Sequence, residues 1–298
     1  MRIADGRAKP SLNAILRSNC YDPIMIDPST LIESLIKLAQ TASDALLVLY
    51  EQHETLTVQT KADHSPLTRA DLLANDILVT GLNQLTPDIP IISEESYFPK
   101  WEERKTWQTY WLLDPLDGTR PFITGSDEFT VNIALIHKHI PIFGLVAPPI
   151  TQECYYAHNN AGAYKIEASG ERKKLHVRPW QAGHTILLTS HGAKEIKIAR
   201  NFKHLGDYTA KKMSSSWKFC LLAEGKADIS PRFGDTSEWD TAAAHCILKE
   251  AGGDIFDLKG RPLRYNTKES LLNPHFIALG DVGALKERVF QSDALFGT

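Results

Sequence analysis

The sequence has few cysteines and no long run of apolar residues. Only four cysteines occur among its 298 residues, and no two of them form a CxxC pair. We interpret them as free thiols in a reducing compartment, because disulfides persist in oxidising ones. No segment approaches the roughly 18 apolar residues that a membrane-spanning helix needs. We therefore expect a cytoplasmic protein, either free or peripheral at the inner face of the membrane.

The sequence also lacks an excess of positive charge. Its 33 Lys and Arg residues face 36 Asp and Glu residues, and the formal net charge is -3. No long basic run is present, which disfavours a nucleic-acid partner. The expected partner is a small molecule, and the sequence leaves open whether the protein is a homodimer.

Two carboxylates stand three residues apart where an apolar strand is predicted to end. Residues 110–113 have the pattern of a buried strand, and Pro115 disfavours its continuation, so Asp114 is expected at the strand tip. Between Asp114 and Asp117, the carbonyl of Leu116 is available as a third oxygen ligand of the kind that magnesium prefers. A solvated turn explains an isolated pattern of this kind equally well.

Two other segments favour the metal interpretation. Glu94 and Glu95 follow the short apolar run 89–92, so a second pair of carboxylates stands at a strand end. Asp240 falls in the first turn of a helix predicted over residues 240–251 and closed by two glycines. Taken alone, Asp240 is most simply a helix cap.

The periodic segments suggest how the chain is organised. Helices are predicted over residues 31–49 and from Thr68 onward, with Asp71 at capping-box spacing, and strands 131–136, 142–147 and 153–158 suggest an antiparallel meander. The polar stretch 168–178 is the best candidate boundary. We divide the chain into an N-terminal extension (1–28), an α+β subdomain with most metal ligands (29–175), and an α/β subdomain that supplies Asp240 and substrate contacts (176–298).

Two long motifs resemble the signatures of the inositol monophosphatase superfamily. They are WLLDPLDGT at residues 111–119, followed by Phe122, and WDTAA at residues 239–243, with the later Gly252-Gly253. Within the superfamily, segments 61–68, 128–135, 218–225 and 231–234 look like those of bacterial 3'(2'),5'-bisphosphate nucleotidases. The resemblance implies a mixed α+β and α/β fold, a layered α/β/α/β/α sandwich with the metal site in the cleft between two subdomains.

The resemblance also implies the roles of individual residues. Two or three Mg²⁺ ions per site would be bound by Glu94, Asp114, the Leu116 carbonyl, Asp117 and Asp240. The catalytic residues would be Asp63, Thr119 and Glu94, with Asp63 and Thr119 preferred as the acceptors of a proton from the attacking water. The substrate would contact Glu94, Asp117, Gly118, Thr119, Ser215, Ser216, Lys218, Arg232 and Asp240. Asp71 is either a helix N-terminal carboxylate or a support behind the metals, and Arg120-Pro121 departs from the Lys-Glu or Lys-Gly common in relatives.

The implied activity is magnesium-dependent hydrolysis of adenosine 3',5'-bisphosphate (PAP) to AMP and phosphate by metal-activated water. Hydrolysis of the sulfated form, PAPS, to APS is left open. The partner would then be a nucleoside bisphosphate, a by-product of sulfate activation. The alternatives are a phosphatase of inositol or sugar phosphates on the same metal centre, and a non-catalytic nucleotide or metal sensor.

Overall fold

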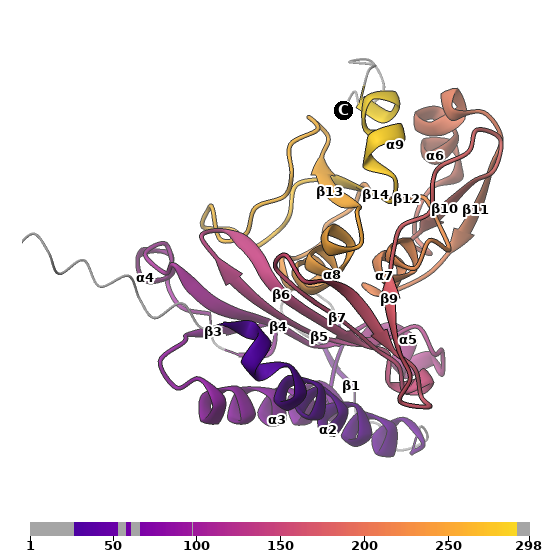
Figure 1. Ribbon diagram of the computed structural model, residues 1–298. Coiled ribbons are helices and arrows are strands. Elements are labelled where there is room, and N and C mark those ends of the chain that lie inside the picture. The colour runs from indigo at the N-terminus through magenta and orange to yellow at the C-terminus, as the bar shows by residue number, and fades with distance from the viewer. Residues whose placement is uncertain (1–26, 53–57, 61–65, 97, 291–298) are drawn as a thin grey trace, which may run out of the picture.

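The computed structural model describes residues 27–52, 58–60, 66–96 and 98–290 (Figure 1). The predicted N-terminal extension therefore lies outside the described residues except for its last two. Within the described part of the chain, none of the helices is both long enough and apolar enough to cross a membrane.

The chain forms one large sheet, a second smaller sheet and a two-stranded ladder. The first sheet has the strand order β3 (Ile91–Ser93), β4 (Thr109–Asp117), β5 (Thr130–His137), β6 (Ile140–Ala147), β7 (Cys154–His158), β8 (Gly162–Ile166) and β9 (Arg172–Leu175). The second has the order β11 (Tyr208–Lys212), β10 (Thr185–Thr189), β12 (Ile229–Arg232), β14 (Phe276–Leu279) and β13 (Asp254–Asp257). The ladder pairs β1 (Val58–Thr60) with β2 (Pro66–Thr68).

Helices lie on both sides of each sheet. They are η1 (Pro28–Leu31), α2 (Ile32–Tyr50), α3 (Arg69–Leu85), α4 (Trp101–Arg104), α5 (Thr119–Thr124), η3 (Pro149–Thr151), α6 (Glu195–Phe202), η4 (Lys203–Leu205), α7 (Trp217–Ala223), α8 (Trp239–Glu250) and α9 (Val282–Phe290).

The layers follow from three apolar clusters. One packs α2 and α3 on the outer face of the large sheet, and one packs α7 and α8 between the two sheets. The third packs α6 and α9 on the outer face of the small sheet (Figure 1). The predicted α/β/α/β/α sandwich is confirmed. The division into subdomains at residue 175 stays a prediction.

The large sheet is longer than the predicted meander. Strands β4 to β9 pair antiparallel in sequence order, so the meander is present, but β8 and β9 extend it beyond residue 158. Strand β9 lies within the stretch 168–178, which was predicted only as a boundary. Its Arg172, Lys173 and Lys174 side chains are exposed, whereas Leu175 is buried. Such a charged strand suits the edge of a sheet, where it opposes pairing with other chains.

Strand β4 was predicted to end before Pro115, and this prediction was wrong. It continues to Asp117 through a bulge, because Asp114 pairs with Asn132 whereas Asp117 already pairs with Thr130. A bulge leaves residues unpaired, so it tolerates a proline that lacks an N–H. The bulge bends the strand just where the two carboxylates stand.

The predicted start of α3 is confirmed in detail. The Thr68 hydroxyl accepts from the Ala70 amide at 3.0 Å, and the Asp71 carboxylate accepts from the Thr68 amide at 2.7 Å. Both halves of a capping box are therefore present, and they place Asp71 at a defined, buried position.

The close approach of α8 to the large sheet depends on Gly144. A Cβ at Gly144 would lie 2.1 Å from the Ala243 carbonyl oxygen and 2.9 Å from the Cys246 Cβ. We expect Gly144→Ala to destabilise the protein by about 1–3 kcal/mol, because the helix backbone must move. Urea unfolding measures this change. The control is Gly283→Ala in α9, whose nearest neighbour is Asp281 Oδ1 at 3.5 Å. A Gly144→Ala variant as stable as this control would contradict the packing.

Candidate metal and phosphate site

Three carboxylates from separate segments meet at one edge of the large sheet. Oxygen atoms of Glu94, Asp114 and Asp240 lie within 4.8 Å of one another. Glu94 directly follows β3, Asp114 lies in β4, and Asp240 lies in the first turn of α8. Because β3 and β4 are parallel, their carboxyl ends reach the same edge. The fold thus brings together residues that are far apart in sequence.

Asp117 lies at the end of β4, beside these three carboxylates. Its Oδ2 accepts a hydrogen bond from the Ser216 amide at 2.5 Å and one from Asn132 Nδ2 at 3.3 Å. It raises the pKa of both Asp114 and Asp240 through its charge. Four carboxyl groups therefore share one small volume.

Burial and mutual repulsion change the protonation of this cluster. Burial, followed by the charges of neighbouring carboxylates, raises the pKa of Asp114 well above its ordinary value. Burial and the charge of Asp117 likewise raise the pKa of Asp240 to about 7. Groups of this kind need cations or protons to be stable together.

The surroundings of one Asp114 oxygen show whether the site fits a metal ion. Asp114 Oδ1 accepts from the Leu116 amide at 3.1 Å, but the buried Oδ2 has no hydrogen-bond partner among the described residues. Buried polar atoms normally have partners, and an all-oxygen set of ligands suits a hard divalent cation. The residues therefore fit Mg²⁺.

Thr119 connects this cluster to Asp71. Its hydroxyl lies 3.0 Å from Asp71 Oδ1, to which it donates, and 3.4 Å from the Leu116 carbonyl oxygen. Asp71 uses its other oxygen to cap α3, so its interpretation as a helix N-terminal carboxylate is confirmed, whereas a role behind the metals stays a prediction. Asp63, predicted as a catalytic residue, lies outside the described residues.

A cavity of about 280 Å³ opens beside the carboxylates. Seven of the nine predicted substrate contacts line it, and Glu94 and Thr119 do not. The seven are Asp117, Gly118, Ser215, Ser216, Lys218, Arg232 and Asp240. Gly118 has φ 102°, and a Cβ there would lie 2.8 Å from the Glu128 carbonyl oxygen, so the turn into α5 requires glycine.

The two predicted cations of this cavity have different surroundings. The Lys218 ammonium is buried and donates to the Ser215 carbonyl. Burial lowers its pKa to about 8, although the charges of Asp117 and Asp240 oppose this effect. Arg232 is more accessible, and it donates from Nε to Thr236 Oγ1 at 2.5 Å and from Nη2 to the Asp235 carbonyl at 2.7 Å.

Glu128 and Asn132 also organise the site, although neither was predicted to do so. Glu128 Oε2 lies 2.8 Å from the Ser214 amide, from which it accepts, and 2.8 Å from His191 Nε2. Asn132 Oδ1 accepts from Ser216 Oγ at 2.8 Å. Both residues lie in the segment 128–135, which is one of those that resemble bisphosphate nucleotidases. The sequence therefore contained a pattern that could have pointed to them.

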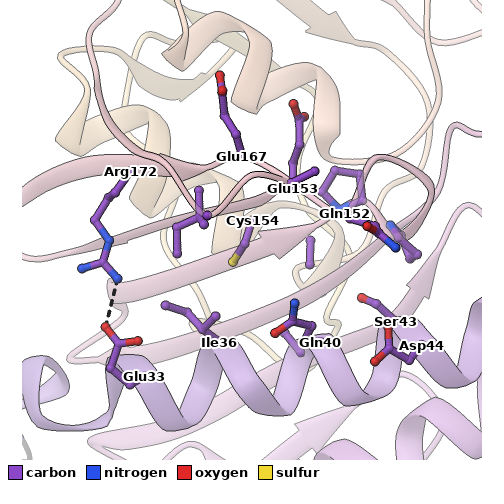
Figure 2. Close-up of a pocket in the computed structure, with 17 residues that line it drawn as sticks. Glu33, Ile36, Gln40, Ser43, Asp44, Gln152, Glu153, Cys154, Glu167 and Arg172 are labelled. Carbon is purple, nitrogen blue, oxygen red and sulfur yellow. Dashed lines mark hydrogen bonds and ion pairs between the residues drawn. The ribbon is translucent and has the colours of Figure 1, made fainter.

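A larger cavity elsewhere in the molecule does not contain the carboxylate cluster. It has a volume of about 410 Å³ and lies between α2 and the region around β7 to β9 (Figure 2). The carboxylates of Glu33, Glu153 and Glu167, which line it, are paired with Arg172 at 2.9 Å, Lys165 at 2.6 Å and Lys173 at 2.8 Å, respectively. Three of the four acidic residues that line it are therefore paired with neighbouring cations.

Comparison with known proteins identifies the family. A model of the inositol monophosphatase family matches residues 27–290. This chain belongs to the inositol monophosphatase family. The 3'(2'),5'-bisphosphate nucleotidase CysQ of Escherichia coli strain K12 is 44% identical over 246 residues, which are 83% of this chain and 98% of that protein.

Solved structures agree with this assignment. The crystal structure of CysQ from Bacteroides thetaiotaomicron matches with a TM-score of 0.71 and 37% identity, covering 82% of this chain and 94% of that chain. The extragenic suppressor protein SuhB from Bartonella henselae matches with a TM-score of 0.72, covering 89% of this chain and 99% of that chain, but at 22% identity it supports the fold alone. The predicted family and the resemblance to bisphosphate nucleotidases are confirmed, and with them the class of phosphoric monoester hydrolases.

Magnesium is expected to stabilise the folded protein in a pH-dependent way. Because the pKa values of Asp114 and Asp240 are raised by folding, the metal-free protein loses stability as the pH rises from about 4 through 7. Mg²⁺ binds the ionised carboxylates and competes with protons. We therefore expect about 10 mM Mg²⁺ to raise the midpoint of thermal unfolding more at about pH 8 than at about pH 5.5. An equal increase at both pH values, or none, would argue against the metal site.

Proposed function

We propose that this protein is a magnesium-dependent phosphomonoesterase that hydrolyses adenosine 3',5'-bisphosphate to AMP and phosphate. The observation that carries the proposal is the Asp114 oxygen that has no hydrogen-bond partner among the described residues. It lies within a group of four carboxylates, beside a cavity that is also lined by Arg120, Lys218 and Arg232. The relatives named 3'(2'),5'-bisphosphate nucleotidase CysQ support the choice of substrate.

Two or three Mg²⁺ ions would be held by Glu94, Asp114, the Leu116 carbonyl, Asp117 and Asp240. When bound, they would neutralise the phosphate oxygens and act as Lewis acids. The contribution of the chain is to gather these ligands on rigid elements. Three of the four carboxylates stand at the ends of β3 and β4, and the fourth stands on α8.

The Thr119 hydroxyl would take part in the transfer of a proton from the attacking water. Because Thr119 donates its own proton to Asp71, its oxygen is left to accept a hydrogen bond from that water. Asp71 would orient the hydroxyl and receive the displaced proton. Asp63, the residue favoured from the sequence, is the competing candidate, and Glu94 would act mainly as a ligand.

The remaining contacts would hold the two ends of the substrate. The amides of Gly118 and Thr119 begin α5 and would bind the scissile phosphate. The second phosphate would meet the hydroxyls of Ser215 and Ser216 and the cations Lys218 and Arg232, which line the same cavity. Charge-assisted hydrogen bonds of this kind favour a substrate with a second anionic group.

Phosphate release in the presence of Mg²⁺ tests this function. The substrates are adenosine 3',5'-bisphosphate, inositol 1-phosphate and fructose 1,6-bisphosphate, with a chelator as the control for metal dependence. We expect kcat/KM for the nucleotide to exceed the others by about 100-fold, or about 2.7 kcal/mol of transition-state binding. A preference for either other ester would instead support the inositol or sugar phosphatase. No metal-dependent release from any of them would support the sensor.

Two matched variants decide between Asp71 and Asp63. Asp71→Asn is expected to lower kcat by about 10²–10⁴-fold, because the amide cannot receive the proton that Thr119 passes on. Asp63→Asn is expected to change kcat by less than about tenfold. Because Asp71 also caps α3, the midpoint of thermal unfolding is compared between Asp71→Asn and the wild-type protein, to check that the variant is folded. The reverse order of effects would restore Asp63 as the partner of Thr119.

A further inference from the structure

The cavity beside α2 has no part in the proposed function. It lies between one face of α2 and the segment that runs from the end of β6 to β9, and we call it the α2 cavity (Figure 2). Its volume of about 410 Å³ falls within the range of roughly 300–1000 Å³ that is usual for small-molecule sites. The residues of α2 that line it share one face of the helix and include Glu33, Ile36, Gln40, Ser43 and Asp44.

Ser43 brings a hydroxyl without a partner into this lining. The residue is only 7% exposed, and its Oγ has no hydrogen-bond partner among the described residues. Buried polar atoms normally have partners, and a buried hydroxyl that lacks one costs free energy. Figure 2 shows Ser43 on the side of α2 that is turned toward the strands. A polar group of a bound molecule would therefore satisfy this hydroxyl from within the cavity.

The charges of the lining leave one carboxylate without a cation. Four acidic side chains line the cavity, and three of them pair with Arg172, Lys165 and Lys173. The fourth, Asp44, is exposed and forms no ion pair within the part of the chain that the structure describes. The unbalanced charge is thus a single negative one. It favours a ligand with one positive charge and opposes an anion.

The rest of the lining is partly polar and partly apolar. The amides of Gln40 and Gln152 can donate and accept hydrogen bonds, whereas Ile36 and Ile166 offer aliphatic surface. Cys154 also lines the cavity, and Figure 2 shows its sulfur pointing toward α2. Burial raises the pKa of this thiol to about 12, so it stays neutral and provides no reactive thiolate. The cavity therefore suits reversible binding rather than a covalent reaction.

We propose that the α2 cavity binds a small organic amine that carries one positive charge. The ammonium group pairs with Asp44 at the exposed edge of the cavity, and a neutral polar group of the same molecule forms a hydrogen bond with the buried Ser43 hydroxyl. The aliphatic part of the molecule contacts Ile36 and Ile166. None of these residues belongs to the carboxylate cluster, so the inference does not depend on the proposed function.

The first test compares two probes that differ in charge. Leucinamide has an ammonium group, an amide and an aliphatic chain, and N-acetylleucinamide lacks the ammonium group. Each is titrated into isotope-labelled wild-type protein at about pH 6, where an α-amino group is protonated, and NMR shifts of backbone amides give the Kd and the location. We expect leucinamide to bind about fivefold more tightly, with the shifts in residues 33–44. Equal affinities, no binding of leucinamide, or shifts confined to the cavity beside the carboxylates would overturn the proposal.

The second test removes the charge of Asp44. Asp44→Asn is expected to weaken the binding of leucinamide about fivefold and to leave that of N-acetylleucinamide unchanged. The matched control is Asp76→Asn, which replaces an exposed aspartate of α3 that does not line the cavity, and both affinities should stay as in the wild type. An Asp44→Asn variant that binds leucinamide as tightly as the control does would contradict the inference.

Ser43→Ala separates binding from folding. Without a probe, this variant is expected to have a higher midpoint of thermal unfolding, because it removes a buried hydroxyl that lacks a partner and because alanine favours a helix. It is also expected to weaken the binding of both probes about fivefold, because each loses a hydrogen bond. Unchanged binding of both probes would overturn the proposal whatever the stability of the variant.

Phosphate release is measured in parallel with these titrations. Neither Ser43 nor Asp44 takes part in the proposed hydrolysis, so both variants are expected to release phosphate at the wild-type rate when no probe is present. Absence of release from the wild-type protein would refute the proposed function, and the comparison of the two probes would still decide this inference.

Discussion

The repulsion between buried carboxylates at the ends of β3 and β4 is the constraint on which the rest of the structure depends. Asp114 is almost fully buried, and one of its oxygens has no hydrogen-bond partner among the residues that the structure describes. Its carboxylate lies within 4.8 Å of oxygens from Glu94 and Asp240. Such an arrangement costs folding free energy unless protons or cations neutralise it. The packing of the remaining elements offsets this folding free energy and keeps the carboxylates together.

Helix α8 is the main support for that assembly. It packs between the two sheets, carries Asp240 in its first turn, and approaches β6 closely at Gly144. Hydrogen bonds also connect the loop before α7 to the end of β4, from the Ser216 amide to Asp117, and to the segment before β5, from the Ser214 amide to Glu128. The four carboxylates and the walls of the cavity beside them therefore belong to one connected network.

Much of this could be predicted from the sequence, because local chemistry is visible in it. The capping box at Thr68, the strand that leads to Asp114 and the helix that begins with Asp240 were all predicted from short patterns. The bulge after Asp114 was not, because pairing register depends on the partner strand β5. The contact between Asp71 and Thr119 joins residues 48 positions apart, so no local pattern could distinguish it from a simple cap. The cavity lined by Arg120, Lys194, Lys197 and Arg232 likewise gathers residues from distant segments of the chain.

The most direct test of the metal site is a crystal structure of this protein soaked in Mn²⁺, with an anomalous difference map. Mn²⁺ uses the same kind of oxygen ligands as Mg²⁺ and can be located unambiguously by its scattering. We predict peaks bounded by Glu94, Asp114, Asp117 and Asp240. A map without peaks there, or with peaks only in the separate cavity beside α2, would contradict a metal-dependent phosphatase built on these four carboxylates.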